Sequence, residues 1–150
     1  MSAVPGIDPT APVRNRSEIE VDASPEVVWE VLTDFGSWPS WNPDVKSMTI
    51  DGPVEPGTVL RWKSGPSTIT SELQSVEPPR SISWTGKTMS IRAFHVWSLE
   101  AKDGKTVVRS DETFQGTVAR IFRRPLQKAI DKSFVDSLSR LKAEAERRAV

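Results

Sequence analysis

Residues 89–114 read MSIRAFHVWSLEAKDGKTVVRSDETF. Two runs rich in β-branched and aromatic residues flank the pair Asp103-Gly104, and an Asp-Gly pair in this setting favours the two-residue turn of a β-hairpin. The stretch therefore predicts two antiparallel strands, from Met89 to Ala101 and from Thr106 to Phe114.

Further extended segments precede this hairpin. Turn signals of Pro, Gly and Asp separate them, and they comprise residues 46–50, 58–63, 67–76 and 81–85. Arg16 to Val21 adds a half-buried strand near the N-terminus, because apolar Ile19 and Val21 alternate with polar residues. The six later strands, joined by short turns, predict an antiparallel meander, and the N-terminal strand brings the sheet to about seven strands.

After the hairpin, the chain is predicted to be helical from Thr117 to its end. Apolar residues recur there at spacings of three and four and would form one face: Phe122, Leu126, Ile130, Phe134, Leu138 and Leu141. Residues 125–148 would span about 36 Å at about 1.5 Å a residue, enough to cross a small domain from end to end.

A short helix is predicted between the first two strands. Ser24 can cap it, Pro25 suits its first position, and Glu26 favours the positive end of the helix dipole. The helix ends near Asp34, and the glycine and prolines that follow break the chain into turns or a brief second helix.

A chain of 150 residues has the size of one domain. Residues 1–14 contain prolines and small residues without periodicity, so we predict a flexible N-terminal tail. Residues 15–150 would form a single α+β domain. Its curved antiparallel sheet would wrap around the long C-terminal helix, with two short helices after the first strand.

Charge and composition exclude several classes of function. Lys and Arg number 20, as do Asp and Glu, so no net charge attracts nucleic acid as a partner. The absence of Cys excludes disulfides and thiolate metal sites and fits a cytoplasmic location. No stretch approaches the roughly 18 apolar residues of a membrane span, so membrane insertion is not expected.

The sequence also lacks the common signatures of nucleotide-dependent and hydrolytic enzymes: a Gly-rich phosphate loop, a Gly-x-Ser-x-Gly elbow and a His-Glu-x-x-His helix. A Ser-His-Asp triad would have to centre on His95, the single histidine, and no serine context supports one. We predict no metal and no cofactor.

Five local segments carry a resemblance to a known superfamily: SPEVVW at 24–29, DFGSWPSWNP at 34–43, VEPPR at 76–80, WSL at 97–99 and GKTVV at 104–108. With the order of elements, they resemble the polyketide cyclase/dehydrase branch of the START-like and Bet v 1-like (SRPBCC) superfamily. The resemblance implies the helix-grip fold and a cavity between sheet and last helix that holds lipids, steroids, polyketides or plant-type small molecules. It does not imply one reaction.

The positions of bulky residues predict which side chains of each hairpin strand point toward the core. Trp97 and Leu99 flank polar Ser98, so we expect both to point inward, while Phe94 and Val96 point outward. Because alternate residues share a face, Met89, Ile91, Ala93 and His95 are then also expected to point inward. On the next strand the inward set is Thr106, Val108, Ser110, Glu112 and Phe114. Asp111 would lie on the opposite face, in solvent.

His95 and Glu112 are the candidate catalytic residues. The imidazole of His95 titrates near neutral pH and could act as a general acid or base, although a hydrogen-bonded core or surface histidine is the alternative. Glu112, if inward, would have its pKa raised by the apolar surroundings and could contact a ligand. The alternative is an ion pair of Glu112 with Arg61 or Arg109 across the sheet.

The candidate ligand-binding residues lie on the strands, the aromatic-proline loop and the last helix. They are Trp41, Trp62, Trp84, Ile91, His95, Trp97, Glu112, Phe114, Phe122, Leu126, Ile130 and Phe134. Three tryptophans in the middle of neighbouring strands could make a flat aromatic wall, although core packing explains them equally well. The basic residues Arg120, Arg123, Arg124 and Lys128 are interpreted as a solvated face, with anion recognition as the alternative.

Three functions stay open on these grounds. The first is a carrier or sensor that binds a small hydrophobic molecule (lipid, polyketide or aromatic) without a covalent step. The second is a polyketide cyclase/aromatase or dehydratase with His95 as general acid or base. The third is an accessory protein that acts through a partner protein. The sequence leaves a homodimer open.

Overall fold

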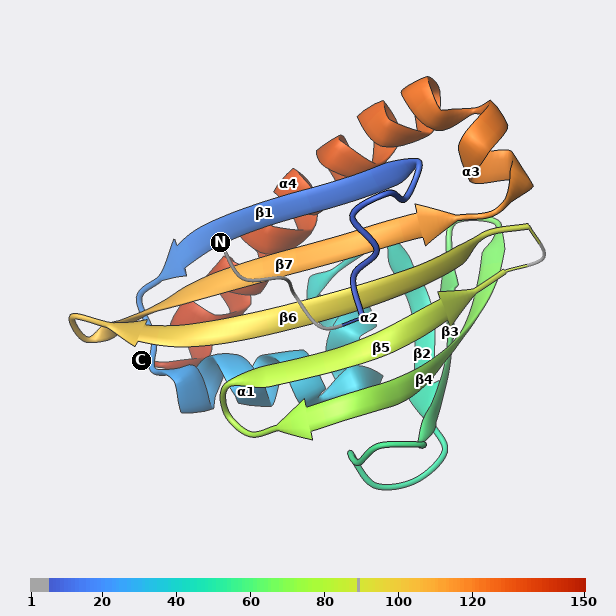
Figure 1. The fold of residues 1–150 in the computed structure, drawn as a ribbon. Helices are drawn as coiled ribbons and strands as arrows, with labels where there is room; N and C mark the ends of the chain where they lie inside the picture. The colour runs from blue at the N-terminus through green and yellow to red at the C-terminus, as the bar shows by residue number, and fades with distance from the viewer. Residues whose placement is uncertain (1–5, 89) are drawn as a thin grey trace.

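The structure is a computed structural model that describes residues 6–88 and 90–150. Its elements follow the predicted order (Figure 1). They are β1 (Val13–Val21), α1 (Pro25–Thr33), the 3-10 helix η1 (Phe35–Ser37), α2 (Trp38–Trp41), β2 (Val45–Ile50), β3 (Val59–Ser64), β4 (Ser67–Glu77), β5 (Ser81–Lys87), β6 (Arg92–Lys102), β7 (Lys105–Gln115), α3 (Thr117–Ile121) and α4 (Arg123–Arg148).

The seven strands form one antiparallel sheet in the order β1-β7-β6-β5-β4-β3-β2, which confirms the predicted meander. The hairpin between β6 and β7 turns at Asp103 and Gly104, whose φ angles are 50° and 80°. Positive φ at both central residues is the condition for a turn whose twist matches that of the strands. This turn pairs Lys102 with Lys105 and sets the register of the whole hairpin.

The helices cover one face of the curved sheet, with α4 running behind β1 and β7 in Figure 1. The buried residues of α4 begin at Phe134 and continue with Leu138, Leu141 and Ala145. The last three pack with α1 and η1 over the sheet in one continuous apolar core. Between Arg123 and Ser133, α4 has no buried residue among those that the structure describes. Space is therefore left between this half of the helix and the sheet.

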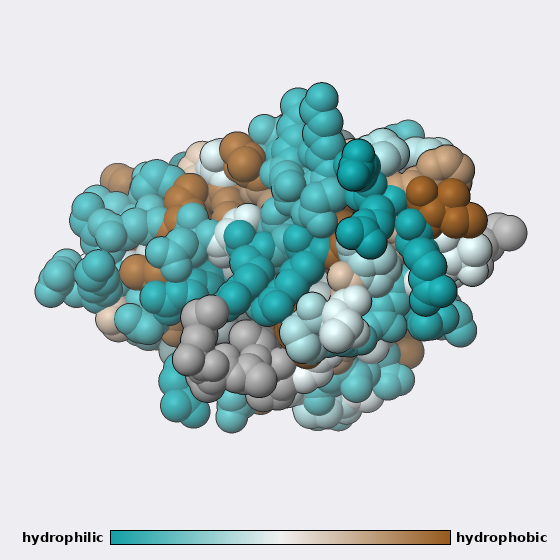
Figure 2. All heavy atoms as spheres, turned by 45° about the horizontal axis from the view of Figure 1, so that its top comes forward, coloured by the Kyte–Doolittle hydropathy of each residue, from teal (hydrophilic) through white to brown (hydrophobic). Residues whose placement is uncertain are grey.

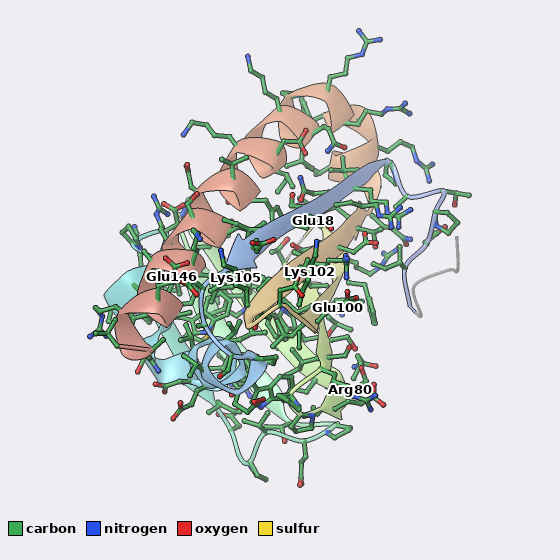
Figure 3. All side chains as sticks on the ribbon, turned by 90° about the vertical axis from the view of Figure 1, so that its left-hand side faces the viewer. Glu18, Arg80, Glu100, Lys102, Lys105 and Glu146 are labelled. Carbon is green, nitrogen blue, oxygen red and sulfur yellow. The ribbon has the colours of Figure 1, made fainter. Side chains whose placement is uncertain are left out.

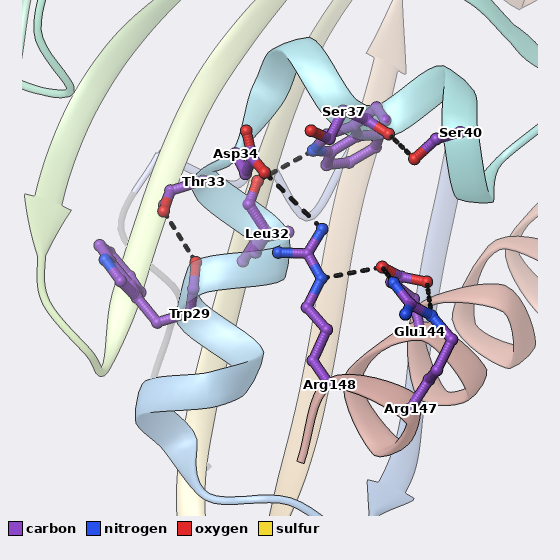
Figure 4. A network of polar contacts seen from close by, with 10 residues as sticks. Trp29, Leu32, Thr33, Asp34, Ser37, Ser40, Glu144, Arg147 and Arg148 are labelled. Atoms are coloured by element: carbon purple, nitrogen blue, oxygen red, sulfur yellow. Dashed lines mark hydrogen bonds and ion pairs between the residues drawn. The ribbon is translucent and has the colours of Figure 1, made fainter. Parts of the chain in front are cut away.

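Polar contacts fix the C-terminal end of α4 against α1 and η1 (Figure 4). Arg148 lies 3.7 Å from Asp34 and donates a hydrogen bond of 2.8 Å to Glu144, which also pairs with Arg147 at 2.6 Å. The hydrogen bond from Arg147 is the largest of the interactions that lower the pKa of Glu144 to about 2. The indole of Trp38 donates to the carbonyl of Leu32 at 3.0 Å, which fixes α2 against α1.

Three predicted boundaries differ from the structure. β1 begins at Val13, three residues before the predicted start, and so takes in the last two residues of the expected tail. The predicted single C-terminal helix is two helices, since the backbone at Phe122 (φ −104°, ψ 29°) separates α3 from α4. β6 begins at Arg92, and Met89, which was expected to point inward, lies outside the described residues.

The prediction that Asp111 is solvated is wrong. Arg16 is the direct neighbour of Asp111 across the β1–β7 pair, and its Nε lies 3.3 Å from the carboxylate. Arg14 adds two parallel hydrogen bonds, from Nε at 3.0 Å and from Nη2 at 2.8 Å. Asp111 is 7% exposed in consequence. The earlier start of β1 brings Arg14 to this position.

Other charges on the outer face stay accessible. Arg109 of β7 pairs with Glu18 at 3.0 Å and with Glu100 at 3.1 Å, and Figure 3 shows these two glutamates on the strands that flank β7. In the described part of the chain, no helix is both long and apolar enough to cross a membrane.

Candidate functional site

A cavity of about 260 Å³ lies between the sheet and the first half of α4. The helix side of the cavity consists of Leu126, Ile130 and Phe134 with two serines, Ser133 and Ser137. Its sheet side is mainly apolar and includes Leu60, Trp62, Ile69, Trp84, Ile91, Ala93, Trp97 and Phe114. The space exists because the buried residues of α4 begin only at Phe134.

Most of the candidate ligand-binding residues line this cavity. The structure places there Trp62, Trp84, Ile91, His95, Trp97, Glu112, Phe114, Leu126, Ile130 and Phe134. The strand parity that follows from Trp97 and Leu99 is therefore right for His95 and Trp97. Phe94 and Val96 lie on the opposite face, although Val96 is only 7% exposed.

Two candidates lie elsewhere. Phe122 is 55% exposed, because the chain bends at this residue between α3 and α4 and turns its ring away from the cavity. Trp41 belongs to the apolar core and packs against Trp38, with ring centroids 4.9 Å apart. It therefore supports the cavity wall from behind, and Trp38 takes the place at the cavity that was expected for Trp41.

The aromatic side chains form a connected wall. The ring of Trp84 lies 6.4 Å from that of Trp97 and 6.2 Å from that of Trp38. His95 lies within this wall, 4.7 Å from Trp97 and 5.3 Å from Phe134 across the cavity. Edge-on and tilted contacts of this kind stabilise rings beyond the area they bury.

Three polar side chains meet at one point of the wall. The Nε2 atom of His95 lies 2.7 Å from Oγ of Ser110, and its Nδ1 atom lies 3.4 Å from Oε1 of Glu112. His95 and Glu112 are direct neighbours across the β6–β7 pair. Ser110 is 2% exposed and is not among the described residues that line the cavity. Its hydroxyl therefore fixes the imidazole and is not placed to attack a ligand.

Burial controls the protonation of this pair. It lowers the pKa of His95 to about 3 and raises the pKa of Glu112 to about 8, because each charged form loses its hydration. At neutral pH Glu112 is therefore protonated, His95 is a neutral imidazole, and the pair carries no net charge. A protonated Glu112 can donate a hydrogen bond to an oxygen of a ligand.

The expected ion pair of Glu112 with Arg61 or Arg109 does not form. Arg61 pairs instead with Asp51 at 3.1 Å, and Arg109 points to the outer face of the sheet with Glu18 and Glu100. The reason is parity, because neighbouring residues on a strand point to opposite faces.

The contact between His95 and Glu112 could have been predicted from the register of the hairpin. The two-residue turn at Asp103-Gly104 pairs Lys102 with Lys105, and counting seven residues outward on each strand reaches His95 and Glu112. The role of Ser110 was harder to find, because its bond to His95 runs diagonally between the strands. Nothing local identified Trp38 in place of Trp41.

Two buried indole nitrogens, those of Trp41 and Trp97, have no hydrogen-bond partner among the described residues. Trp97 lines the cavity, and a buried N–H group normally has an acceptor. In the described ranges, no group of three or more His, Asp or Glu side chains could hold a metal ion.

Comparison with known proteins connects this geometry to a family. The sequence model of the family described as polyketide cyclase / dehydrase and lipid transport matches residues 12–146. No curated protein matches the chain at a significant level.

Several solved structures share the fold. A hypothetical protein from Helicobacter pylori has a TM-score of 0.83 and 14% sequence identity, over 97% of this chain and 99% of that one. The Zhui aromatase/cyclase from a Streptomyces species has a TM-score of 0.74 and 19% identity, over 91% and 95%. A START superfamily protein from Mycobacterium smegmatis has a TM-score of 0.69 and 18% identity, over 91% and 96%. At these identities the likeness shows the helix-grip fold alone. The family match covers nearly the whole chain, and the protein therefore belongs to the polyketide cyclase / dehydrase and lipid transport family.

Proposed function

We propose that the protein binds a small hydrophobic molecule in the cavity under α4 and acts as a carrier or sensor. The observation that carries this proposal is the lining: aromatic and aliphatic side chains from the sheet and α4 surround the space. The protonatable groups among the described lining residues are His95, Glu112 and Asp44. Burial keeps His95 and Glu112 uncharged, and Asp44 pairs with Arg140 at 2.9 Å. An apolar cavity with few, well-placed polar groups is typical of small-molecule sites.

The size and polarity of the cavity narrow the ligand class. A volume of about 260 Å³ lies just below the usual range for small-molecule sites, about 300 to 1,000 Å³. It suits a molecule with one or a few rings better than a lipid with two acyl chains. Protonated Glu112 and the indole N–H of Trp97, which has no partner among the described residues, favour a ligand that carries a hydrogen-bond acceptor, such as a carbonyl or hydroxyl oxygen.

The test is binding by a variant with a filled cavity. Ala93 lines the cavity on β6, and Ala93→Leu should occupy part of the space. Ala101 lies exposed on the same strand, so Ala101→Leu is the matched control. Native mass spectrometry of both variants and the wild type, purified from the host, should find a co-purified small molecule in the wild type and in Ala101→Leu, and less of it in Ala93→Leu. Equal occupancy in all three would contradict binding in this cavity.

The second candidate is a cyclase or dehydratase. The specific observation in its favour is the raised pKa of Glu112 beside His95, since a proton donor and acceptor in contact within an apolar cavity can move a proton to and from a ligand. Against it, both ring nitrogens of His95 already face protein groups. We therefore place binding first. A cytoplasmic location and a homodimer remain predictions from the sequence.

A further inference from the structure

The corner between α3 and α4 exposes two large apolar side chains. Gly116 precedes α3 with a φ of 116°, and a Cβ atom there would lie 2.6 Å from the carbonyl oxygen of Ser90, so glycine is needed for the chain to turn. α3 then ends at Ile121, and the bend at Phe122 begins α4. Ile121 is 67% exposed and Phe122 is 55% exposed. Figure 2 shows a brown patch over the α3 end, at the right of the view, bordered by teal residues.

Cations surround these two residues. Arg120, Arg123, Arg124 and Lys128 lie in the same segment, and the sequence has no Asp or Glu between Glu112 and Asp131. None of the four forms an ion pair with any described residue, whereas Lys132, one turn beyond Lys128, pairs with Asp136 at 3.3 Å. The chain is neutral as a whole, so this corner is a local excess of positive charge.

More positive charge borders the corner on the sheet side. Lys87 and Arg92 line a polar cleft together with Arg120. The acidic residue of that cleft, Asp8, accepts hydrogen bonds from Thr10 and Gln115. Its charge is thus partly satisfied by neutral groups.

The corner adjoins the cavity. The backbone N–H of Leu126 donates to the carbonyl of Phe122 at 2.9 Å, and Leu126 and Ile130 line the cavity one and two turns further along α4. This half of α4 is held to the edge strand by side chains: Gln127 bonds to the backbone of Arg14 and Asp131 to Asn15, at 2.8 Å each.

We propose that the α3–α4 corner, residues 117–128, docks the protein onto an anionic membrane surface. The exposed Ile and Phe lie next to Arg and Lys side chains that pair with no described acidic residue. The apolar side chains can enter the interface between headgroups and acyl chains while the cations contact anionic headgroups. A second copy of the chain is a poorer partner, because two such corners would bring like charges together. Docking would place the cavity next to the membrane, a source of hydrophobic ligands.

Vesicle binding by the full chain tests the proposal without any cavity ligand. Vesicles of phosphatidylcholine alone are compared with vesicles that contain one third phosphatidylglycerol, at low and high salt. We expect binding to the anionic vesicles only, weakened by salt because salt screens exposed charges. Arg123→Ser combined with Arg124→Ser should lower the partition coefficient roughly 25-fold, at about fivefold for each cation. Phe122→Ser should lower it on vesicles of the same composition.

Matched controls lie on the same molecule. Val135 is 64% exposed on α4 outside the cationic segment, so Val135→Ser should bind like the wild type. Lys102 lies at the β6–β7 turn, at the opposite end of the sheet from α3 in Figure 1, so Lys102→Ser controls for the loss of a cation. Thermal melts check folding, and if the Phe122 variant melts early, the charge variants alone decide the outcome.

Several results would overturn the proposal. They are the absence of binding to anionic vesicles, equal binding to both vesicle types, or an equal loss in the control variants. Capture of a protein or a nucleic acid by the corner without vesicle binding would assign it to that partner instead. Docking and the proposed cavity function fail separately, because Ala93→Leu should leave vesicle binding unchanged.

Discussion

The Nδ1 atom of His95 lies 3.4 Å from Oε1 of Glu112, and the two residues face each other across β6 and β7. Their pKa values move in opposite directions, since burial favours the neutral form of each. The pair therefore adds no net charge to an apolar cavity at neutral pH, and it still holds a proton that a ligand can contact.

This pair should give the protein a distinctive dependence of stability on pH. Between about 6.5 and 8, Glu112 is protonated in the folded state but ionised in the unfolded chain, so stability falls as the pH rises. Between about 6.5 and 3, His95 is neutral in the folded state but charged once unfolded, so it contributes a loss of stability as the pH falls. The two effects oppose each other between about 4.5 and 6.5, where we expect the greatest stability. Denaturant titrations across this range should show the alkaline loss in the wild type and much less of it in Glu112→Gln. A wild type equally stable at about pH 6.5 and 8 would contradict the raised pKa.

His95→Gln separates binding from catalysis. A glutamine amide can replace the hydrogen bond to Ser110, so ligand affinity should change by no more than about 0.5 to 1.5 kcal/mol, the value of one neutral hydrogen bond. If the protein is a cyclase or dehydratase, turnover of a polyketide or β-hydroxy carbonyl substrate should fall by about 10² to 10⁴ while binding survives. We expect only the small change in ligand affinity, without a loss of turnover. Turnover that collapses while the ligand stays bound would favour the enzyme.

Much of the fold followed from local patterns in the sequence. The Asp103-Gly104 turn, the strand alternation and the spacing of Leu138 and Leu141 each reflect a short-range constraint, and the family resemblance carried by residues 24–43 is confirmed by the family match. The inward position of Trp97 depended on the period of two along a strand. These features need no knowledge of distant neighbours.

The wrong predictions concern residues whose exposure or partners depend on contacts distant in the sequence. Phe122 continues the apolar period of the last helix, so the sequence could not show that the chain bends there and exposes it. Asp111 has the parity of an outward residue, and only the early start of β1 places Arg14 over its carboxylate. The hydrogen bond between His95 and Ser110 was not predicted, because Ser110 reaches the ring from the next strand.

The carboxylate of Asp111 should contribute more to stability than an ordinary surface charge. Asp111→Asn keeps the shape but removes the charge that Arg14 and Arg16 share. Because the pair is largely shielded from water, we expect a loss of about 1 to 3 kcal/mol in the free energy of unfolding, as for a charged hydrogen bond. Asp136→Asn is the control, since its pair with Lys132 is exposed and should be worth about 0.5 kcal/mol or less. Equal losses in urea unfolding would show that the Asp111 cluster has no special role.

Substitutions of two apolar residues of α4 should affect stability and ligand binding differently. Leu141 is fully buried in the core away from the cavity, so Leu141→Ala should cost about 2 to 5 kcal/mol and leave ligand binding intact in the folded fraction. Phe134 is 8% exposed and faces the cavity beside His95. Its replacement by Ala enlarges an existing space, so it should cost less than the roughly 3 to 5 kcal/mol of a Phe in a closed core. The same change removes a ring from the cavity wall and should weaken retention of the co-purified ligand. If Phe134→Ala destabilises the fold as strongly as Leu141→Ala and retains the ligand fully, Phe134 belongs to the core and not to the binding site.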